Sequence, residues 1–251
     1  MHLILTGATG LGGSSILQTM LAHPSITKIS ILSRNPVPLA ETHANHEKAH
    51  VIIHSDFNHY PESVLEQLKG AEGCVWALGT SISGMDKKKY IEITHTYPLS
   101  AARAFSHLNS PRPFKFLYIS CIIANTTPGP RTPWIGAVKG QTESDLLALP
   151  VMEKSCENLR VYNVRLGALD ASEHEEIREF LPQRKVEMNW VDLFAVVRKL
   201  SKNMYTPTRE MAKVVTELML GDGERLEELY AIQESGGRTL SNSGLRWLGG
   251  W

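Results

Sequence analysis

Short apolar runs alternate with amphipathic segments through the first two thirds of the chain. The apolar runs have the length and β-branched content of buried strands, and the segments between them place apolar residues at helical spacing. This alternation predicts an α/β fold, a doubly wound parallel Rossmann sheet with helices on both faces, in which ligands bind at the carboxyl ends of the strands. The expected strands are Leu3–Thr6, Ile29–Ser33, His50–His54, Gly73–Ala77, Phe114–Ser120 and Leu159–Leu166, and the expected helices are Leu11–Ala22, Glu62–Leu68, Lys89–Leu108 and Lys139–Leu149.

The pattern changes after residue 166. The segment Ala171–Lys185 is rich in charge, and two later segments, Val191–Leu200 and Pro207–Leu220, are predicted helices. Thr208 would be the N-cap of the second of these or lie in its first turn. The segment Arg238–Trp247 resembles a capped terminal helix. Because no repeat or linker separates this part from the rest, we expect one domain, 1–251, whose residues 167–251 form a small substrate-side region that covers the open end of the sheet.

Composition limits the binding partners and the cellular compartment that we expect for this protein. The chain has 251 residues, with 26 basic and 26 acidic side chains that cancel. No basic stripe stands out, so neither nucleic acid nor a membrane surface is an expected partner. Without a leader or an apolar segment long enough to span a bilayer, a cytoplasmic protein with a small-molecule substrate is expected. A homo-oligomer remains open, and the densest cationic run, Lys87-Lys88-Lys89, is expected to be a solvated helix start.

Neither the cysteines nor the histidines predict a metal site. Cys74, Cys121 and Cys156 are too scattered for a zinc cluster or a disulfide framework. Four histidines recur at spacings of three and four residues, but this segment includes an expected strand and lacks completing ligands, so a solvated loop is expected instead. The four are His43, His46, His50 and His54.

A glycine turn directly follows the first strand. Gly7, Gly10 and Gly13 recur at intervals of three between an apolar strand and an amphipathic helix. This is the context in which a glycine turn and the free N–H groups of a helix N-terminus hold a pyrophosphate. The predicted dinucleotide-binding residues of this turn are Thr6, Gly7, Thr9, Gly10, Leu11, Gly12 and Gly13.

The ends of the next strands supply further candidate cofactor contacts. Arg34 follows the second strand, where an NAD-selective site would offer a carboxylate, so it suits the 2′-phosphate of NADP(H). An ordinary exposed arginine is the alternative. After the third strand, Asp56 would hydrogen-bond the adenine amine and Phe57 would flank the ring, unless the two simply form a turn. After the fourth strand, the small-residue turn of Ala77, Leu78 and Gly79 would let the chain pass close to the cofactor.

These residues resemble the short-chain dehydrogenase/reductase superfamily, in particular its extended and atypical branches. The opening matches the motif TGxxGxxG, and further similarities are Tyr118-Ile119-Ser120-Cys121, Val138-Lys139-Gly140 and Val164-Arg165-Leu166-Gly167. Within the superfamily, Ile93–Tyr97 and the Lys139 segment resemble the atypical group that includes the Tat-interacting protein and its fungal relatives. The resemblance implies that Leu166 and Gly167 border the nicotinamide.

The same resemblance shows three positions at which the expected catalytic site differs from the superfamily pattern. The superfamily uses a Tyr-x-x-x-Lys pair, and four residues before Lys139 stands Ile135, which has no phenol. Trp134 is adjacent, but an indole N–H is not an acid or base near neutral pH. The usual hydroxyl after the fifth strand is replaced by Cys121, with Ser120 one residue earlier, and the usual asparagine of the fourth helix corresponds to Thr94.

The implied function is that of an NADP(H)-dependent oxidoreductase acting on a small organic carbonyl or related substrate by a non-standard proton relay. The candidate catalytic residues are Lys139, Ser120, Cys121 and Trp134. A displaced phenol could come from Tyr97, Tyr118, Tyr162 or Tyr205. Two alternatives remain open: a protein that senses NADP(H) without catalysis, and a non-redox isomerase or cyclase that reuses the fold.

Overall fold

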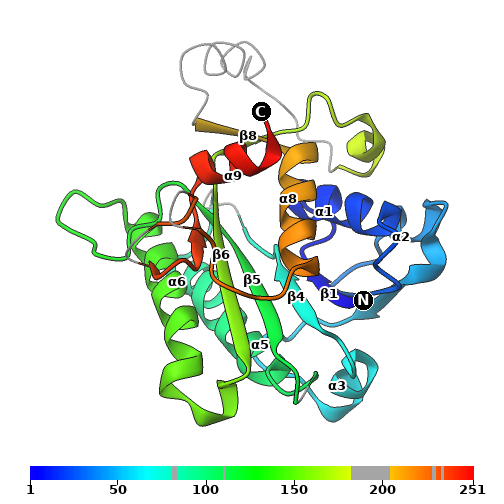
Figure 1. The fold of residues 1–251 in the computed structure, drawn as a ribbon, viewed down its shortest axis with the longest axis horizontal. Helices are drawn as coiled ribbons and strands as arrows, with labels where there is room; N and C mark the ends of the chain where they lie inside the picture. The colour runs from blue at the N-terminus through cyan, green and yellow to red at the C-terminus, as the bar shows by residue number, and fades with distance from the viewer. Residues whose placement is uncertain (81–83, 110, 182–203, 228–229, 233–234) are drawn as a thin grey trace.

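Seven parallel strands form the central sheet of the computed structural model, which describes residues 1–251 except 81–83, 110, 182–203, 228–229 and 233–234. The strand order is β3-β2-β1-β4-β5-β6-β9, so the chain starts in the middle and winds outward in both directions (Figure 1). The predicted α/β fold is therefore confirmed, with the six predicted strands placed to within one residue at each end. The strands are β1 (His2–Thr6), β2 (Lys28–Ser33), β3 (Ala49–Ile53), β4 (Gly73–Trp76), β5 (Phe114–Cys121), β6 (Leu159–Leu166) and β9 (Thr239–Leu240).

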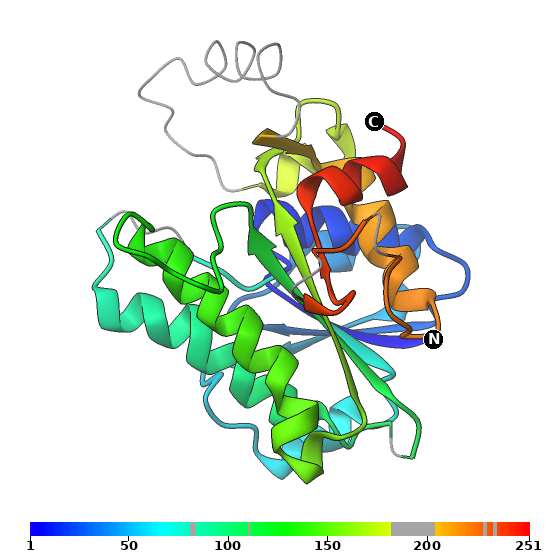
Figure 2. The same ribbon diagram turned by 60° about the vertical axis from the view of Figure 1, so that its left-hand side comes forward.

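Helices cover both faces of this sheet (Figures 1 and 2). One face carries α1 (Leu11–Ala22), α2 (Pro38–Thr42) and α8 (Thr208–Leu220), and α1 and α8 pack together. The other carries α3 (Glu62–Leu68), α5 (Tyr97–Phe105) and α6 (Trp134–Met152). Each face buries its own apolar cluster, which is why the strands are apolar on both sides rather than alternating.

The predicted helix Lys89–Leu108 is interrupted. It consists of α4 (Lys87–Ile91), a π-helical turn η2 (Glu92–Thr96) and α5. Asp86 caps α4 by accepting hydrogen bonds from two backbone N–H groups, so the lysine run is a solvated helix start as predicted. The predicted helix Lys139–Leu149 is the middle of α6, which is longer at both ends. Periodicity finds such helices but not a one-residue π-bulge, which leaves the apolar pattern almost unchanged.

The C-terminal part adds the edge strand β9 and the helix α8 to the sheet, and it differs from the sequence prediction in its last segment. Pro207 is the N-cap of α8, so Thr208 lies in the first turn, the second of the two positions predicted for it. The segment predicted as one terminal helix begins as strand β9, and the helix α9 (Asn242–Gly249) starts only after its N-cap Ser241. The predicted helix Val191–Leu200 lies outside the described residues. Shorter elements are η1 (His46–Lys48), η3 (Lys154–Cys156), β7 (Ala168–Asp170), η4 (Glu175–Phe180) and β8 (Tyr205–Pro207).

Successive side chains of strand β5 point to opposite faces of the sheet, so the candidate catalytic residues at its end do not all face the same way. Phe116, Tyr118 and Ser120 share the face that α5 and α6 cover, whereas Leu117 and Ile119 pack on the α1 and α8 side. Adjacent strand positions therefore enter different environments. Among the described residues, no helix combines the length and apolar character that crossing a bilayer requires.

Candidate functional site

The glycine turn between β1 and α1 is held directly against the end of β4. Gly7 has a φ of 70°, and a Cβ there would overlap the backbone carbonyl of Ala77. A Cβ at Gly13 would likewise overlap the carbonyl of Gly7. The Thr6 hydroxyl accepts a hydrogen bond from the Leu78 N–H at 3.2 Å. These contacts explain why the turn needs glycine, and they bring the ends of β1 and β4 together as one edge of a binding pocket.

The N-terminus of α1 opens onto this pocket. Gly10 is its N-cap, and neither a side-chain cap nor an acidic residue in the first turn satisfies the free N–H groups of this helix. Such an end attracts anions through its unpaired donors and its dipole. The first turn of α1 is therefore suited to a phosphate group.

A pocket lies at the carboxyl ends of β1, β2 and β4. Its volume is 140 Å³, and it contains the predicted residues Arg34 and Phe57. Phe57 is buried and fixed by edge contacts with His54 and Trp76 at ring-centroid distances of 5.3 and 5.9 Å. Among the described residues, no acidic side chain lines this pocket. Its lining residues are Gly7, Thr9, Gly10, Leu32, Ser33, Arg34, Asn35, Phe57, Ala77, Leu78 and Gly79.

Asp56, which was expected to reach the adenine, is placed differently from Phe57. Its side chain is exposed and accepts the backbone N–H of Asn58 at 3.1 Å, so it forms a local turn. It is not among the pocket residues. The remaining features fit an adenine dinucleotide: a buried aromatic face, an exposed guanidinium and a helix N-terminus.

At the chemical end, Lys139 of α6 contacts a tyrosine from the sheet. Its Nζ lies 3.4 Å from the Tyr118 hydroxyl and 5.2 Å from the centre of that ring. The Tyr118 hydroxyl donates to the backbone carbonyl of Thr94 in η2 at 3.3 Å. Of the four tyrosines named as sources of a displaced phenol, Tyr118 is the one that the structure brings to Lys139.

The other candidate catalytic residues lie at the end of β5 and the start of α6, and no hydrogen bond joins them to this pair among the described residues. Cys121 is half-buried at the end of β5. Ser120 is buried, and its hydroxyl has no hydrogen-bond partner among the described residues. Trp134, 39% exposed, begins α6. Its ring contacts Tyr90 at 5.0 Å, with Lys87 Nζ 5.6 Å from the ring centre.

The segment after β5 lies directly on the first turns of α6. Side chains at Gly136 and Gly140, one helical turn apart, would overlap the carbonyl oxygens of Ile123 and Asn125. The Asn125 N–H donates to the Gly136 carbonyl at 3.0 Å. Two glycines on one helix face thus let the backbone of this loop reach α6. Ile122 and Ile123 remain exposed, and an open cavity of 800 Å³ is lined by Ile123, Asn125 and 129–133.

The end of β6 is fixed by the small sheet above it. The Gly167 N–H donates to the Thr206 hydroxyl at 2.8 Å, and a Cβ at Gly167 would overlap the backbone of Met204. Leu166 is buried and pairs with Cys121 across the two strands. The two residues expected to border the nicotinamide therefore lie beside the end of β5.

The four histidines of the predicted loop lie on different elements. His43 is the C-cap of α2, and His46 and His50 belong to η1 and β3. His54 is not solvated as expected: it is buried against Tyr60, with ring centroids 5.1 Å apart. Among the described residues, no group of three potential ligands is arranged to hold a metal ion.

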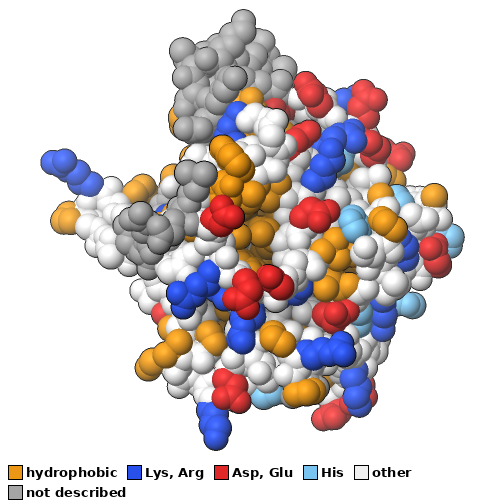
Figure 3. Space-filling view, in the orientation of Figure 1, with side chains coloured by type: hydrophobic (Ala, Val, Ile, Leu, Met, Phe, Trp, Pro, Cys, Tyr) orange, Lys and Arg blue, Asp and Glu red, His pale blue; other side chains and the backbone are white. Residues whose placement is uncertain are grey.

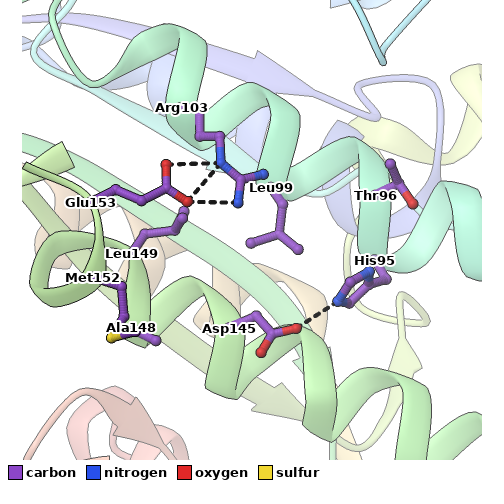
Figure 4. A pocket seen from close by; sticks show the side chains of 9 residues that line it. All are labelled: His95, Thr96, Leu99, Arg103, Asp145, Ala148, Leu149, Met152 and Glu153. Atoms are coloured by element: carbon purple, nitrogen blue, oxygen red, sulfur yellow. Dashed lines mark hydrogen bonds and ion pairs between the residues drawn. The ribbon is translucent and has the colours of Figure 1, made fainter. Parts of the chain in front are cut away.

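Two further grooves lie away from this site. One, of 320 Å³, lies between α6 and the helical segment of η2 and α5, and its lining includes the hydrogen-bonded pair His95–Asp145 and the ion pair Arg103–Glu153 (Figure 4). The other, of 410 Å³, runs beside α8 and α9 and includes Val214, Leu218 and Leu248; apolar side chains gather there in Figure 3. Neither groove is lined by a residue of the glycine turn, by Lys139 or by Tyr118.

Comparisons with known proteins agree with this fold. No family model matches the chain. It is 32% identical over 265 residues to the leucinostatins biosynthesis cluster protein T of Purpureocillium lilacinum, covering 98% of this chain and 94% of that protein. It is 31% identical over 157 residues to the botcinic acid biosynthesis cluster B protein 16 of Botryotinia fuckeliana, covering 61% of this chain and 98% of that protein.

Solved structures share the fold at low identity. A short-chain dehydrogenase/reductase from Saccharomyces cerevisiae superposes with a TM-score of 0.64 at 17% identity, covering 96% of this chain and 95% of that chain. L-Sorbose reductase from Gluconobacter frateurii, in complex with NADPH and L-sorbose, gives a TM-score of 0.63 at 17% identity, covering 88% and 92%.

Proposed function

We propose that this chain, which belongs to the same family as the leucinostatins biosynthesis cluster protein T and has the fold of the short-chain dehydrogenase/reductases, is an NADP(H)-dependent oxidoreductase. The observation that carries this proposal is the pocket at the carboxyl ends of β1, β2 and β4, which includes Arg34 and has no acidic side chain among its described lining residues. A carboxylate there would select the ribose hydroxyls of NAD(H), whereas a guanidinium makes charge-assisted hydrogen bonds with a 2′-phosphate.

When bound, the cofactor would supply or accept a hydride. In this proposal the first turn of α1 binds the pyrophosphate, Phe57 packs on the adenine and Arg34 binds the 2′-phosphate. Lys139 binds the nicotinamide ribose through its ammonium group, and Leu166 with Gly167 borders the nicotinamide. Each of these roles uses a side chain or backbone group at the carboxyl edge of the sheet, where such folds bind their ligands.

The substrate is proposed to be an organic carbonyl or related compound with apolar substituents. The cavity after β5 is open, and the exposed side chains beside it include Ile122, Ile123 and Trp134. Exposed apolar side chains that gather at a cleft favour an apolar ligand. Both relatives are named as biosynthesis cluster proteins, which supports a step in making a natural product.

Ile135 favours a second candidate, an NADP(H)-binding protein that performs no redox chemistry. At this position the superfamily motif has the tyrosine that exchanges a proton with the substrate, and isoleucine cannot do so. This candidate predicts cofactor binding without turnover. A third, an isomerase or cyclase, predicts a product that forms equally well after NADPH is removed.

Direct titration separates these candidates. We expect NADPH to bind more tightly than NADH in calorimetry and to raise the thermal unfolding temperature of the purified protein. With apolar ketones and aldehydes present, loss of NADPH absorbance would then identify a reductase. Failure of NADPH both to bind and to stabilise the protein would refute the cofactor assignment. Tight binding without turnover of any carbonyl would favour the second candidate.

A further inference from the structure

Lys139 has a phenol partner, but that partner belongs to the sheet rather than to its own helix. Tyr118 reaches Lys139 from β5, and its side chain is 1% exposed. The ring faces the ammonium group at 5.2 Å, and the hydroxyl lies 3.4 Å from Nζ. The phenol therefore contacts Lys139 through both its π-face and its oxygen.

The direction of the hydrogen bonds in this cluster is fixed by the Thr94 carbonyl. This oxygen accepts from the Tyr118 hydroxyl at 3.3 Å and from the Thr142 hydroxyl at 3.2 Å. A phenol has one proton, so with that proton bound to Thr94 its oxygen faces Lys139 as an acceptor. Lys139 then donates one N–H to Tyr118. Among the described residues Lys139 has no other hydrogen-bond acceptor, so its other two N–H groups are available to a ligand.

The electrostatics of the cluster keep the charge on Lys139. Burial lowers the pKa of Lys139, but Tyr118, Cys121 and Tyr90 outweigh it and leave this pKa above its usual value. Burial raises the pKa of Tyr118, and Lys139 only partly opposes that rise. Glu143 on α6 also raises the pKa of Tyr118. At neutral pH the cluster is therefore an ammonium group beside a neutral phenol.

We propose that Tyr118 is a positioning residue that holds the Lys139 ammonium group at the end of β5 and so replaces the hydroxyl partner that Ile135 cannot provide. This inference rests on the proposed function. With no phenol at position 135, the held ammonium group would use one N–H for the nicotinamide ribose and direct another at the substrate oxygen, where it would stabilise negative charge. Tyr118 is buried and does not touch the substrate itself.

The test compares Tyr118→Phe with Tyr162→Phe. The Tyr162 hydroxyl, on the opposite face of the sheet, donates to the Glu224 carbonyl and does not contact Lys139. Loss of the Tyr118 oxygen leaves Lys139 in its buried setting without an acceptor, so its pKa should fall. An amine-specific reagent at pH 9, quantified by mass spectrometry in the cofactor-free protein, should then label Lys139 at least about threefold faster, which corresponds to half a pKa unit. Tyr162→Phe should label at the wild-type rate.

Turnover provides the second readout. The alkaline limb of the pH–rate profile should move to lower pH in Tyr118→Phe and stay in place in Tyr162→Phe. If Tyr118→Phe does not fold, a ring-fluorinated tyrosine introduced at position 118 keeps the shape and lowers the pKa of the phenol. The phenolate that it forms beside Lys139 should raise the pKa of Lys139 and slow its labelling at pH 9. An unchanged labelling rate in the folded variant would overturn the inference even if NADPH binds. Conversely, faster labelling in a protein that never binds NADPH would refute the proposed function and leave the Tyr118–Lys139 coupling intact.

Discussion

The carboxylate of Glu143 and the guanidinium of Arg165 form an ion pair between α6 and β6, with Oε2 and Nη2 2.6 Å apart. Glu143 is completely buried, and the Nε–H of Arg165 donates to both of its carboxylate oxygens. Glu143 follows Lys139 by one helical turn, so this pair fixes the part of α6 that presents the lysine.

Arg165→Ala should therefore destabilise the protein by roughly 3–5 kcal/mol, because it leaves a buried carboxylate without a partner. Denaturant unfolding followed by circular dichroism measures the loss. The double variant Glu143→Leu with Arg165→Met should recover much of it, because no isolated charge remains. If the double variant is no more stable than Arg165→Ala, the ion pair is not the source of the effect.

Gly140→Ala should destabilise the protein although the same change usually stabilises a helix by about 1 kcal/mol. A methyl group at this position would overlap the Asn125 carbonyl, and so displace the loop after β5 at a cost of roughly 1–3 kcal/mol. Gly79→Ala, where the added methyl meets no atom of the described residues within 4 Å apart from its chain neighbours, is the control and should be close to neutral in chemical denaturation. A stabilised Gly140→Ala variant would show that the loop does not rest on α6.

Arg34→Ala should weaken NADPH binding by roughly ten- to a hundredfold, the value of one or two charge-assisted hydrogen bonds. Binding of NADH, which has no 2′-phosphate, should change little, and calorimetric titration of both cofactors gives the comparison. Lys28→Ala is a matched control, since Lys28 lies at the start of β2, at the opposite edge of the sheet. Equal losses for NADPH and NADH would argue against a 2′-phosphate contact.

Ile135→Tyr should raise carbonyl reductase activity, because it places a phenol four residues before Lys139 on the exposed end of α6. Ile135→Phe is the control, since it adds the ring without the hydroxyl. The initial rate of NADPH oxidation with an apolar ketone measures both. If the two variants have the same rate, the missing phenol at position 135 is not the only reason for low reductase activity.

Stability should fall as the pH is lowered from about 6.5 towards 4. Burial, with smaller contributions from Lys28 and His50, lowers the pKa of His2 to about 4. Since the unfolded chain binds this proton more tightly, the neutral form stabilises the fold above the unfolded pKa, and that stability is lost as the pH falls towards the folded pKa. The loss attributable to His2 is on the order of 3 kcal/mol.

His2→Gln should flatten the same pH dependence, measured as the free energy of unfolding at several pH values. Some slope should remain, because burial also lowers the pKa values of His54 and His174. Identical slopes for the wild type and His2→Gln would contradict the assignment.

The sequence by itself determined the layers of this protein and the place of its glycine turn. Strand and helix periodicity are local properties, and Gly7 is required by a turn that forms within a few residues. Lys139 and the missing phenol at Ile135 were identified by the resemblance to the superfamily's Tyr-x-x-x-Lys motif. Local information also placed Arg34 and Phe57 at strand ends, where parallel strands bring such residues into one pocket.

Only the tertiary structure decided which side chains meet. Tyr118 contacts Lys139 because β5 and α6 pack face to face, and nothing in the spacing of 21 residues between them specifies this. His54 is buried because Tyr60 folds back over it, whereas the polarity of its segment suggested solvent. The break at η2 positions the Thr94 carbonyl between two hydroxyl groups, a consequence of helix packing that apolar periodicity does not encode.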